Sequence, residues 1–217
     1  MSGTAEAFIT AGTAAAAPPL TPEIRLHLAT EVTPLWQATE DALEYDGVEP
    51  PFWAFAWPGG QALARHVIDH PETVAGKRVL DIASGSGIVA IAAAKAGAGR
   101  VTANDIDPLA VAAIRLNAAM NGVSLIVSGA DLLDAVPVEG WDVILAGDVF
   151  YERTMARRMA AWLSDRAADG AAILVGDPSR AYLPEDGLAC IATYEVPTSL
   201  ELEDSAIRVT RIWRTTP

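Results

Sequence analysis

The chain has 217 residues, of which 51% are hydrophobic and 20% charged, and its formal net charge is −13 at pH 7. This composition excludes a disordered chain and suits one α/β domain with a full core. No apolar run reaches membrane-spanning length, because Lys95 and Arg100 interrupt the most apolar stretch. The acidity disfavours nucleic acid as a partner and favours a cationic one, although acidity also serves solubility alone.

Residues 1–19 are predicted to be a flexible tail, since Ala and Pro dominate its second half and the first basic residue is Arg25. A signal peptide or a mitochondrial presequence would carry Lys or Arg earlier, so neither is expected. The one cysteine, Cys190, excludes an internal disulfide, and we expect it in the core. These features favour a cytoplasmic protein, the Ala-rich composition favours a bacterial source, and a monomer is expected.

The remainder, residues 20–217, reads as a single domain with an N-terminal helical extension to about residue 75. The Pro and Glu that follow Thr21 predict a helix from there to Trp36, outside the main sheet. Apolar residues four apart predict a second helix from Gln61 to Asp69, which Pro71 ends.

Strands and helices are then predicted to alternate. The expected strands are 78–82, 100–104, 124–127, 141–146 and 171–176, and the expected helices are 88–96, 108–120 and 152–167. Two further β-rich runs, 188–195 and 206–214, have no helical pattern between them and are expected to pair as an antiparallel hairpin. The fold class is therefore α/β, a doubly wound, mostly parallel seven-stranded sheet with ligands beyond the carboxyl ends of the strands.

A glycine loop follows the first of these strands. Its run from Gly85 to Ala90 fits the pattern G-x-G-x-x-A of dinucleotide-binding proteins, and Asp105 lies at a suitable distance for a ribose carboxylate. A nicotinamide-dependent oxidoreductase is thus one interpretation. However, Asp81 lies four residues before Gly85, where its carboxylate would repel a pyrophosphate and attract a cation.

Two more carboxylates follow the next two predicted strands. Asp105 is placed to bind a ribose, with Ile106 beside it to lie on an adenine face, and Asp131 is placed to accept the adenine amino group. Asp105 could instead cap the next helix, and Asp131 could be an ordinary turn residue. Three carboxylates at three strand ends suit a positively charged, phosphate-free adenosine, and S-adenosylmethionine is such a ligand.

These motifs make the chain resemble the class I (seven-β-strand) S-adenosylmethionine-dependent methyltransferases, and within them the lysine methyltransferases of the electron transfer flavoprotein β-subunit. The resemblance runs from about Leu20 to the C-terminus. It is carried by residues 20–24, 51–54, 57–63, 79–87, 103–108, 147–151 and 176–178. The family pattern D-x-G-x-G-x-G has glycine where this chain has Ala83, which we expect to fit if the backbone keeps φ negative there.

The cofactor contacts that we expect come from the strand ends and the loops after them. They are Trp57, Asp81, Ser84, Gly85, Gly87, Asp105, Ile106, Asp131 and Leu132. We expect no metal, because His66 and His70, four apart on a helix, have no third ligand nearby and are interpreted as surface residues.

Asp148 follows the fourth predicted strand and is assigned to capture and orient the substrate amine. A lysine must be neutral when it attacks, whereas a carboxylate favours its charged form, so proton loss is left to water. Phe150 and Tyr151 are expected to line the lysine channel by cation–π attraction. The alternatives are that Asp148 caps a helix start and that the two aromatic residues belong to the core.

The tryptophan-rich segment before the second helix is expected to form a wall over the methionine end of the ligand. Backbone N–H groups of Gly59 and Gly60 would face the ligand's carboxylate there. Trp53 fits this wall and the core equally well, and residues 176–180 fit a substrate contact and a simple turn equally well.

The predicted function is transfer of methyl groups from S-adenosylmethionine, with S-adenosylhomocysteine as product, to protein lysine side chains. By resemblance the substrate is the β-subunit of electron transfer flavoprotein. The alternatives are a methyltransferase acting on a ribosomal protein or a small molecule, the nicotinamide-dependent oxidoreductase, and a non-catalytic adenosine-binding module. Neither nucleic acid nor a membrane is expected as a partner.

Overall fold

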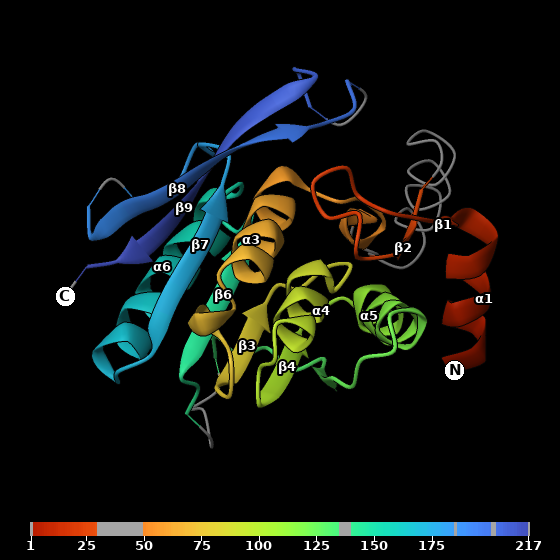
Figure 1. Cartoon of the computed structure of the whole chain (residues 1–217), viewed down its shortest axis with the longest axis horizontal. Helices are drawn as coiled ribbons and strands as arrows, with labels where there is room; N and C mark the ends of the chain where they lie inside the picture. The colour runs from red at the N-terminus through yellow and green to blue at the C-terminus, as the bar shows by residue number, and fades with distance from the viewer. Residues whose placement is uncertain (1, 30–49, 135–139, 185, 201–202, 217) are drawn as a thin grey trace.

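The computed structural model describes residues 2–29, 50–134, 140–184, 186–200 and 203–216. Its centre is a seven-stranded sheet with the order β5-β4-β3-β6-β7-β9-β8 (Figure 1). The strands are β3 (Arg78–Ile82), β4 (Arg100–Asn104), β5 (Ile126–Ser128), β6 (Val143–Gly147), β7 (Ala172–Asp177), β8 (Leu188–Pro197) and β9 (Ile207–Thr215). The first five pair in parallel, whereas β9 is antiparallel to both β7 and β8. The predicted fold class and hairpin are confirmed, with β8 as the edge strand and β9 inside it.

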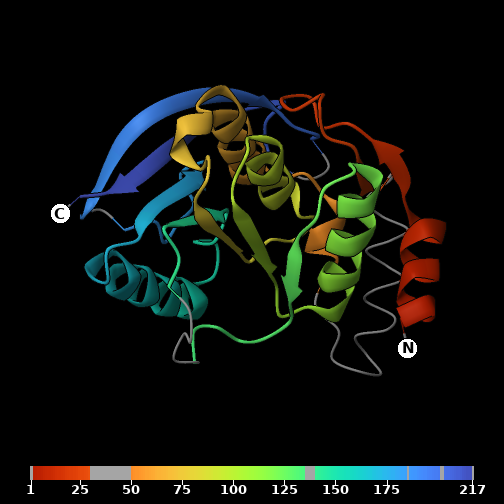
Figure 2. The ribbon, with the colours of Figure 1, turned by 60° about the horizontal axis from the view of Figure 1, so that its bottom comes forward.

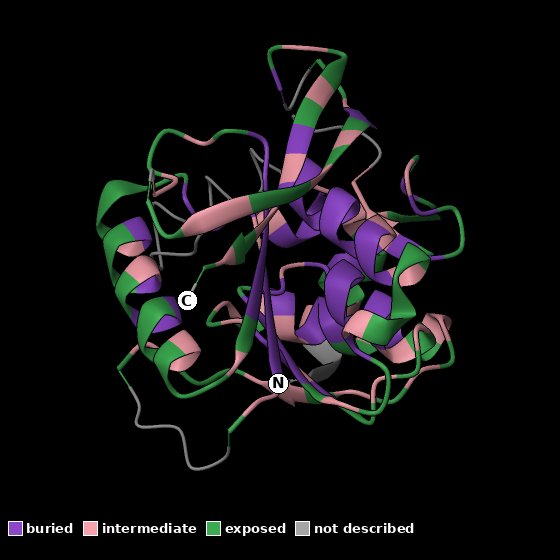
Figure 3. Cartoon of the chain, turned by 60° about the vertical axis from the view of Figure 1, so that its left-hand side comes forward, coloured by how far each residue is buried: buried purple, intermediate pink, exposed green. Residues whose placement is uncertain are grey.

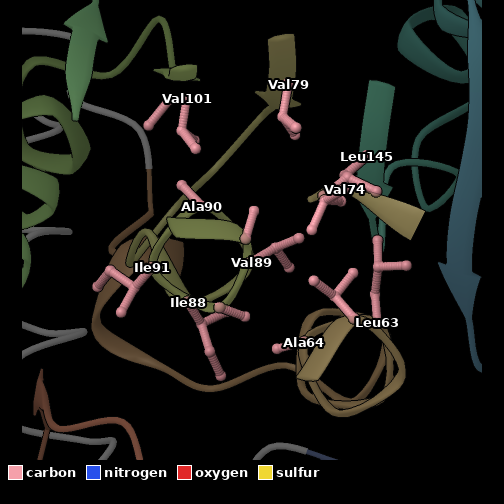
Figure 4. Close-up of a cluster of buried hydrophobic side chains, with 14 of the residues drawn as sticks. Leu63, Ala64, Val74, Val79, Ile88, Val89, Ala90, Ile91, Val101 and Leu145 are labelled. Atoms are coloured by element: carbon pink, nitrogen blue, oxygen red, sulfur yellow. The ribbon is translucent and has the colours of Figure 1, made fainter. Parts of the chain in front are cut away.

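Helices cover both faces of the sheet. They are α3 (Pro58–Asp69), α4 (Ile88–Lys95), α5 (Pro108–Met120) and α6 (Arg153–Ala168). Successive strand residues point to opposite faces, so Val79 packs with α3 and α4, while its neighbour Leu80 packs with α6. Figure 4 shows the first of these clusters, with Leu63 of α3 and Ile91 of α4 among its side chains. Figure 3 shows how the buried residues gather along the sheet and the helices packed on it.

The N-terminal segment is folded, and the predicted flexible tail is wrong. Helix α1 (Ser2–Gly12) lies beside α5 (Figures 1 and 2), and its Ile9 is fully buried in a cluster with α5 residues. Strand β1 (Ala14–Ala16) pairs with β2 (Leu26–Leu28). The prediction failed because a docked helix needs only one buried face, and an Ala-rich run gives little sign of it.

The predicted helix from Thr21 is also wrong over β2, and the rest of it, residues 30–36, lies outside the described residues. The short 3-10 helices η1 (Phe52–Ala54) and η2 (Pro71–Thr73) flank α3. Helix α3 ends at Asp69 as the sequence predicts, but it begins at Pro58, three residues before the predicted start at Gln61. Within the described residues, the predicted N-terminal helical extension, from residue 20 to about residue 75, is therefore helical only in η1, α3 and η2.

Two side chains lie where the sequence did not place them. Cys190 is exposed on the edge strand β8 and not in the core. His66 is buried, with Nδ1 3.2 Å from the hydroxyl of Tyr194. Within the described ranges, no helix is long and apolar enough to cross a bilayer, and no three His, Cys, Asp or Glu side chains gather in an arrangement that could hold a metal ion.

Candidate active site

One cavity of about 730 Å³ opens at the carboxyl ends of β3, β4, β5 and β6. Parallel strands bring their carboxyl ends to the same edge of a sheet, so residues distant in sequence meet there. Of the predicted site residues, those that line the cavity are Trp57, Gly85, Asp105, Ile106, Asp131, Leu132, Asp148 and Tyr151. Those that do not are Asp81, Ser84, Gly87 and Phe150.

The loop after β3 forms one wall of the cavity through Ala83 and Gly85. Ala83 has φ = 52° and Gly85 has φ = 54°, both in the left-handed region. The condition under which Ala83 was expected to fit, a negative φ, is not met: the chain keeps the turn that a glycine would favour and accepts the strain of a methyl group there.

The carboxyl group of Asp81 lies beneath this loop and not in the cavity. Its Oδ2 accepts hydrogen bonds from the Ser84 hydroxyl and from Ala90 N–H, at 3.0 Å, in the first turn of α4. Burial raises the pKa of Asp81 to about 7, against these two hydrogen bonds, which lower it. Asp81 thus ties β3, the glycine loop and α4 together, and its predicted direct attraction for the ligand is replaced by a supporting role. Gly87, with φ = 83°, begins α4 behind the loop.

The loops after the next two strands supply polar and apolar groups beside the glycine loop. Asp105 accepts Gly85 N–H at 2.8 Å and Asp107 N–H at 3.1 Å, and burial raises its pKa. Ile106 beside it is 64% exposed and lines the cavity, so its apolar side chain is free to contact a ligand there. Asp131 pairs with Arg158 at 3.2 Å and lies next to Leu132.

Asp148 lies at the end of β6, buried, with φ = 55°. Its Oδ2 accepts Gly60 N–H at 2.9 Å, and its Oδ1 pairs with the guanidinium of Arg180 at 2.8 Å. Burial raises the pKa of Asp148 to about 6, although Arg180 and Gly60 N–H both lower it. The predicted exposure of the α3 N-terminus to a ligand carboxylate is wrong for Gly60, because Asp148 accepts its N–H.

Glycines let α3 approach the sheet closely enough for this bond. A Cβ on Gly59 would lie 2.5 Å from Asp148 Oδ2 and would overlap the carbonyl oxygen of Gly176. A Cβ on Gly147 would lie 3.0 Å from Gly60 Cα. The glycines therefore place the start of α3 directly against the carboxylate of Asp148.

Aromatic rings surround the cavity beside Asp148. The ring of Phe52 lies 5.9 Å from that of Trp57 and 5.5 Å from that of Tyr151, measured between centroids. Trp57 Nε1 donates to the carbonyl oxygen of Phe52 at 2.8 Å, which fixes the indole. Phe150 is instead buried in the core against α6, so its predicted place in the channel is wrong. Trp53 serves both of the roles considered for it, because it is buried and also lines the cavity.

Sequence reasoning missed two residues of this site. Phe52 stands in a segment noted for its tryptophans, and only the turn of η1 brings its ring to Tyr151. Arg180 lies in the turn after β7, in a segment whose sequence fits a substrate contact and a plain turn equally well. One feature of the sequence indicates this contact. Arg180 follows β7, and the neighbouring strand β6 is followed by Asp148, so a cation and a carboxylate come to the same edge of the sheet.

Known structures share this architecture. A ribosomal protein L11 methylase from Lactobacillus delbrueckii subsp. bulgaricus superimposes with a TM-score of 0.52 at 22% identity, covering 75% of this chain and 81% of its own. The magnesium protoporphyrin IX methyltransferase of Synechocystis with bound S-adenosylmethionine gives a TM-score of 0.54 at 21% identity, covering 72% and 78%. These likenesses concern the fold. With the sheet order, they show that the chain has the Rossmann-like fold of class I methyltransferases.

The family follows from sequence comparison. The electron transfer flavoprotein β-subunit lysine methyltransferase of Danio rerio is 38% identical over 90% of this chain and 76% of its own. The Homo sapiens protein of that name is 36% identical over 89% and 75%. The model of the ribosomal protein L11 methyltransferase (PrmA) family matches residues 64–151. The chain belongs to the electron transfer flavoprotein β-subunit lysine methyltransferase family and is an S-adenosylmethionine-dependent lysine methyltransferase.

Proposed function

We propose that this enzyme transfers methyl groups to lysine side chains of the electron transfer flavoprotein β-subunit, and that its reaction takes place in the cavity at the strand ends. One observation carries the assignment of the site: Asp148 and four aromatic side chains line the same cavity as Asp105 and Ile106. One cavity therefore holds groups suited to an adenosine at one end and groups suited to an alkylammonium at the other.

The residues present fit S-adenosylmethionine. We assign the ribose hydroxyls to the carboxylate of Asp105, a face of the adenine to the exposed Ile106, and the adenine edge to Asp131 and Leu132. The ligand supplies a methyl group on a positively charged sulfur. Support for this placement comes from the position of Asp105 and Ile106 side by side in the cavity lining and from the cavity volume of about 730 Å³, which falls in the usual range for a small-molecule site.

At the other end, Asp148 receives the lysine side chain. Its carboxylate accepts hydrogen bonds from the amine and fixes the direction of the nitrogen lone pair, while the Trp57 and Tyr151 rings enclose the methylene stem and exclude water. Such positioning supplies most of the rate increase in a displacement that needs no acid or base at the transition state. The proton leaves the ammonium for solvent water before the nitrogen attacks.

A second substrate class is favoured by one observation, the match to the ribosomal protein L11 methyltransferase family. That match covers residues 64–151, from within α3 to just past β6, and so includes Asp105 as well as Asp148 and Tyr151 of the cavity. It leaves out the hairpin β8–β9 and the N-terminal segment, which flank the site. We therefore assign the flavoprotein subunit as substrate and treat the ribosomal protein as an outcome of the test.

The sequence-based expectations about source and location stay proposals. The vertebrate relatives named above give no support to the bacterial source that the composition favoured. A cytoplasmic location and a monomeric state likewise rest on the sequence alone, as does the expectation of no metal, nucleic acid or membrane partner.

The test offers methyl-labelled S-adenosylmethionine and the purified enzyme to the flavoprotein β-subunit, to ribosomal protein L11 and to a small-molecule extract in parallel. Mass spectrometry then locates the label. We expect methylated lysines in the β-subunit alone. Label in the ribosomal protein or in the small-molecule fraction, with none in the β-subunit, would overturn the substrate assignment.

The role of Asp148 is tested by Asp148→Asn and Asp148→Ala, with Asp142→Ala as the matched control. Asp142 directly precedes the same strand at its other end and pairs there with Arg78 at 2.7 Å. We expect both Asp148 variants to bind the cofactor in calorimetry and to lose about 100-fold in kcat/KM, and Asp142→Ala to keep normal activity. Normal methyl transfer by Asp148→Ala would refute the assignment.

A further inference from the structure

The guanidinium of Arg180 occupies a place that the mechanism above does not use. The residue follows β7, and its side chain, 17% exposed, reaches across to Asp148 with N–H···O distances of 2.8 and 3.2 Å. It also lies over the ring of Trp57, 5.7 Å from the centroid. A carboxylate and an aromatic face hold this cation, and both of them also line the cavity.

A second carboxylate fixes Arg180 from the other side. Glu203, whose side chain is 4% exposed, accepts from Arg180 at 2.7 Å and from Arg208 at 3.0 Å. Arg208 in turn pairs with Asp204 at 3.0 Å. The charges alternate in sign from the cavity to the start of β9, so the guanidinium stays charged and in place.

The groups that face Asp148 come from three elements. They are the guanidinium of Arg180, Gly60 N–H at the start of α3, and Asp177 at the end of β7, whose negative charge raises the pKa of Asp148. The carboxylate of Asp177 itself accepts a hydrogen bond from the backbone N–H of Arg180 at 2.7 Å. Among the described residues of this group, Arg180 is the one that brings a full positive charge.

A positive charge at this point has a chemical consequence for the acceptor. A lone buried carboxylate would stabilise the ammonium form of an arriving lysine and so hold it unreactive. A fixed cation beside that carboxylate cancels much of this field and disfavours a second positive charge. The lysine then loses its proton to water at lower pH, and the neutral nitrogen keeps its hydrogen bond to the carboxylate.

We propose that Arg180 is a positioning residue for methyl transfer, which orients Asp148 and sets the charge of the acceptor site so that the lysine arrives as the neutral amine. The inference rests on the proposed function, because it assumes that a lysine side chain binds at Asp148.

The test measures the pH dependence of kcat and kcat/KM for Arg180→Met and Arg180→Lys, with Arg166→Met as control. Arg166 has the same kinds of partner outside the cavity: Asp169 at 2.8 Å and the ring of Trp162 at 5.5 Å. In Arg180→Met the pKa values of Asp148 and of the bound amine both rise. We expect the acid limb of the profile to move up by about one pH unit, which is about a tenfold loss of rate on that limb. Arg180→Lys keeps the charge and should keep the wild-type limb, as should Arg166→Met.

Glu203→Gln gives an independent test of opposite sign. It removes the negative charge behind Arg180, so the acid limb should move to lower pH. The proposal would be overturned if the acid limb of the pH profile of Arg180→Met stayed at the pH of the wild-type limb, even if the variant were slower. If that variant does not fold, a Glu203→Gln limb that stays in place or rises would do so. Failure of the proposed function is distinct, because the wild-type enzyme would then methylate no lysine at any pH.

Discussion

Backbone strain in this molecule is concentrated at single residues around the cavity. In the described part of the chain, the non-glycine residues with positive φ are Ala83 (52°), Asp148 (55°) and Ser179 (70°). Each follows the carboxyl end of a parallel strand, β3, β6 or β7. Left-handed geometry costs an L-residue about 1–2 kcal/mol, so it persists where the surrounding structure enforces it. At Asp148 the left-handed backbone directs the carboxylate into the site. At Ala83 it serves only the path of the loop.

Because Ala83 and Gly85 both have a positive φ, exchanging alanine and glycine at these two positions should have opposite effects on stability. Ala83→Gly should stabilise the fold by roughly 0.5–1 kcal/mol, the relieved strain less the entropy that glycine adds to the unfolded chain. Gly85→Ala should destabilise it by a similar amount, since φ is 54° there and only Trp53 Cα, at 3.9 Å, lies near the added Cβ. Urea unfolding measures both. A destabilised Ala83→Gly variant would show that the loop does not hold the left-handed turn.

At the scale of elements, two docking events build the site around the sheet. Helix α3 lies against β6 and β7 through glycines, so its N-terminus caps the carboxylate of Asp148. Helix α1 docks on α5, whose first residues Pro108 and Ala110 follow the Asp105 loop. Because α5 packs against η1 as well as α1, the N-terminal segment supports the side of the cavity that carries Phe52 and Trp53.

The docking of α1 is tested by a buried and an exposed residue next to each other. Ile9→Ala should cost about 2–4 kcal/mol of unfolding free energy, because Ile9 is fully buried and its loss leaves a cavity. Phe8→Ala is the control, since Phe8 is 37% exposed, and should cost under about 1 kcal/mol. Urea unfolding followed by circular dichroism makes the comparison. Equal, small effects would mean that residues 1–19 behave as the tail that the sequence suggested.

At the scale of the whole molecule, several carboxyl groups are buried in a chain whose net charge is already −13. Burial raises the pKa of Asp81 to about 7 and of Asp148 to about 6, and it raises those of Asp105 and Asp177 as well. At these four carboxylates the folded state therefore binds more protons than the unfolded state between about pH 4 and about pH 7, and their contribution to stability falls as pH rises through that window. Burial lowers the pKa values of His27 and His66, and these two groups act in the opposite direction.

Asp81→Asn isolates one of these groups. The amide oxygen can still accept from Ser84 and Ala90 N–H, yet it never has to ionise. Relative to the wild type, the variant should gain about 2–3 kcal/mol of unfolding free energy as the pH is raised from about 5 to about 8. Urea unfolding at both pH values measures the gain. A difference between the two proteins that does not change with pH would contradict the raised pKa.

The sequence by itself determined the order along the chain of the strands and helices from residue 78 onward, and most of the predicted site residues line the cavity at the strand ends. Hydrophobic periodicity, prolines and carboxylates at strand ends are local signals in the sequence. Parallel pairing then brings the strand ends, and the residues on them, to one edge of the sheet. Only the tertiary structure decided the docking of α1, the burial of Phe150 and Asp81, the left-handed Ala83, and the pairing of Asp148 with Arg180 and Gly60. These depend on which faces meet and how closely backbones approach, and a local pattern of residues does not encode distances between elements.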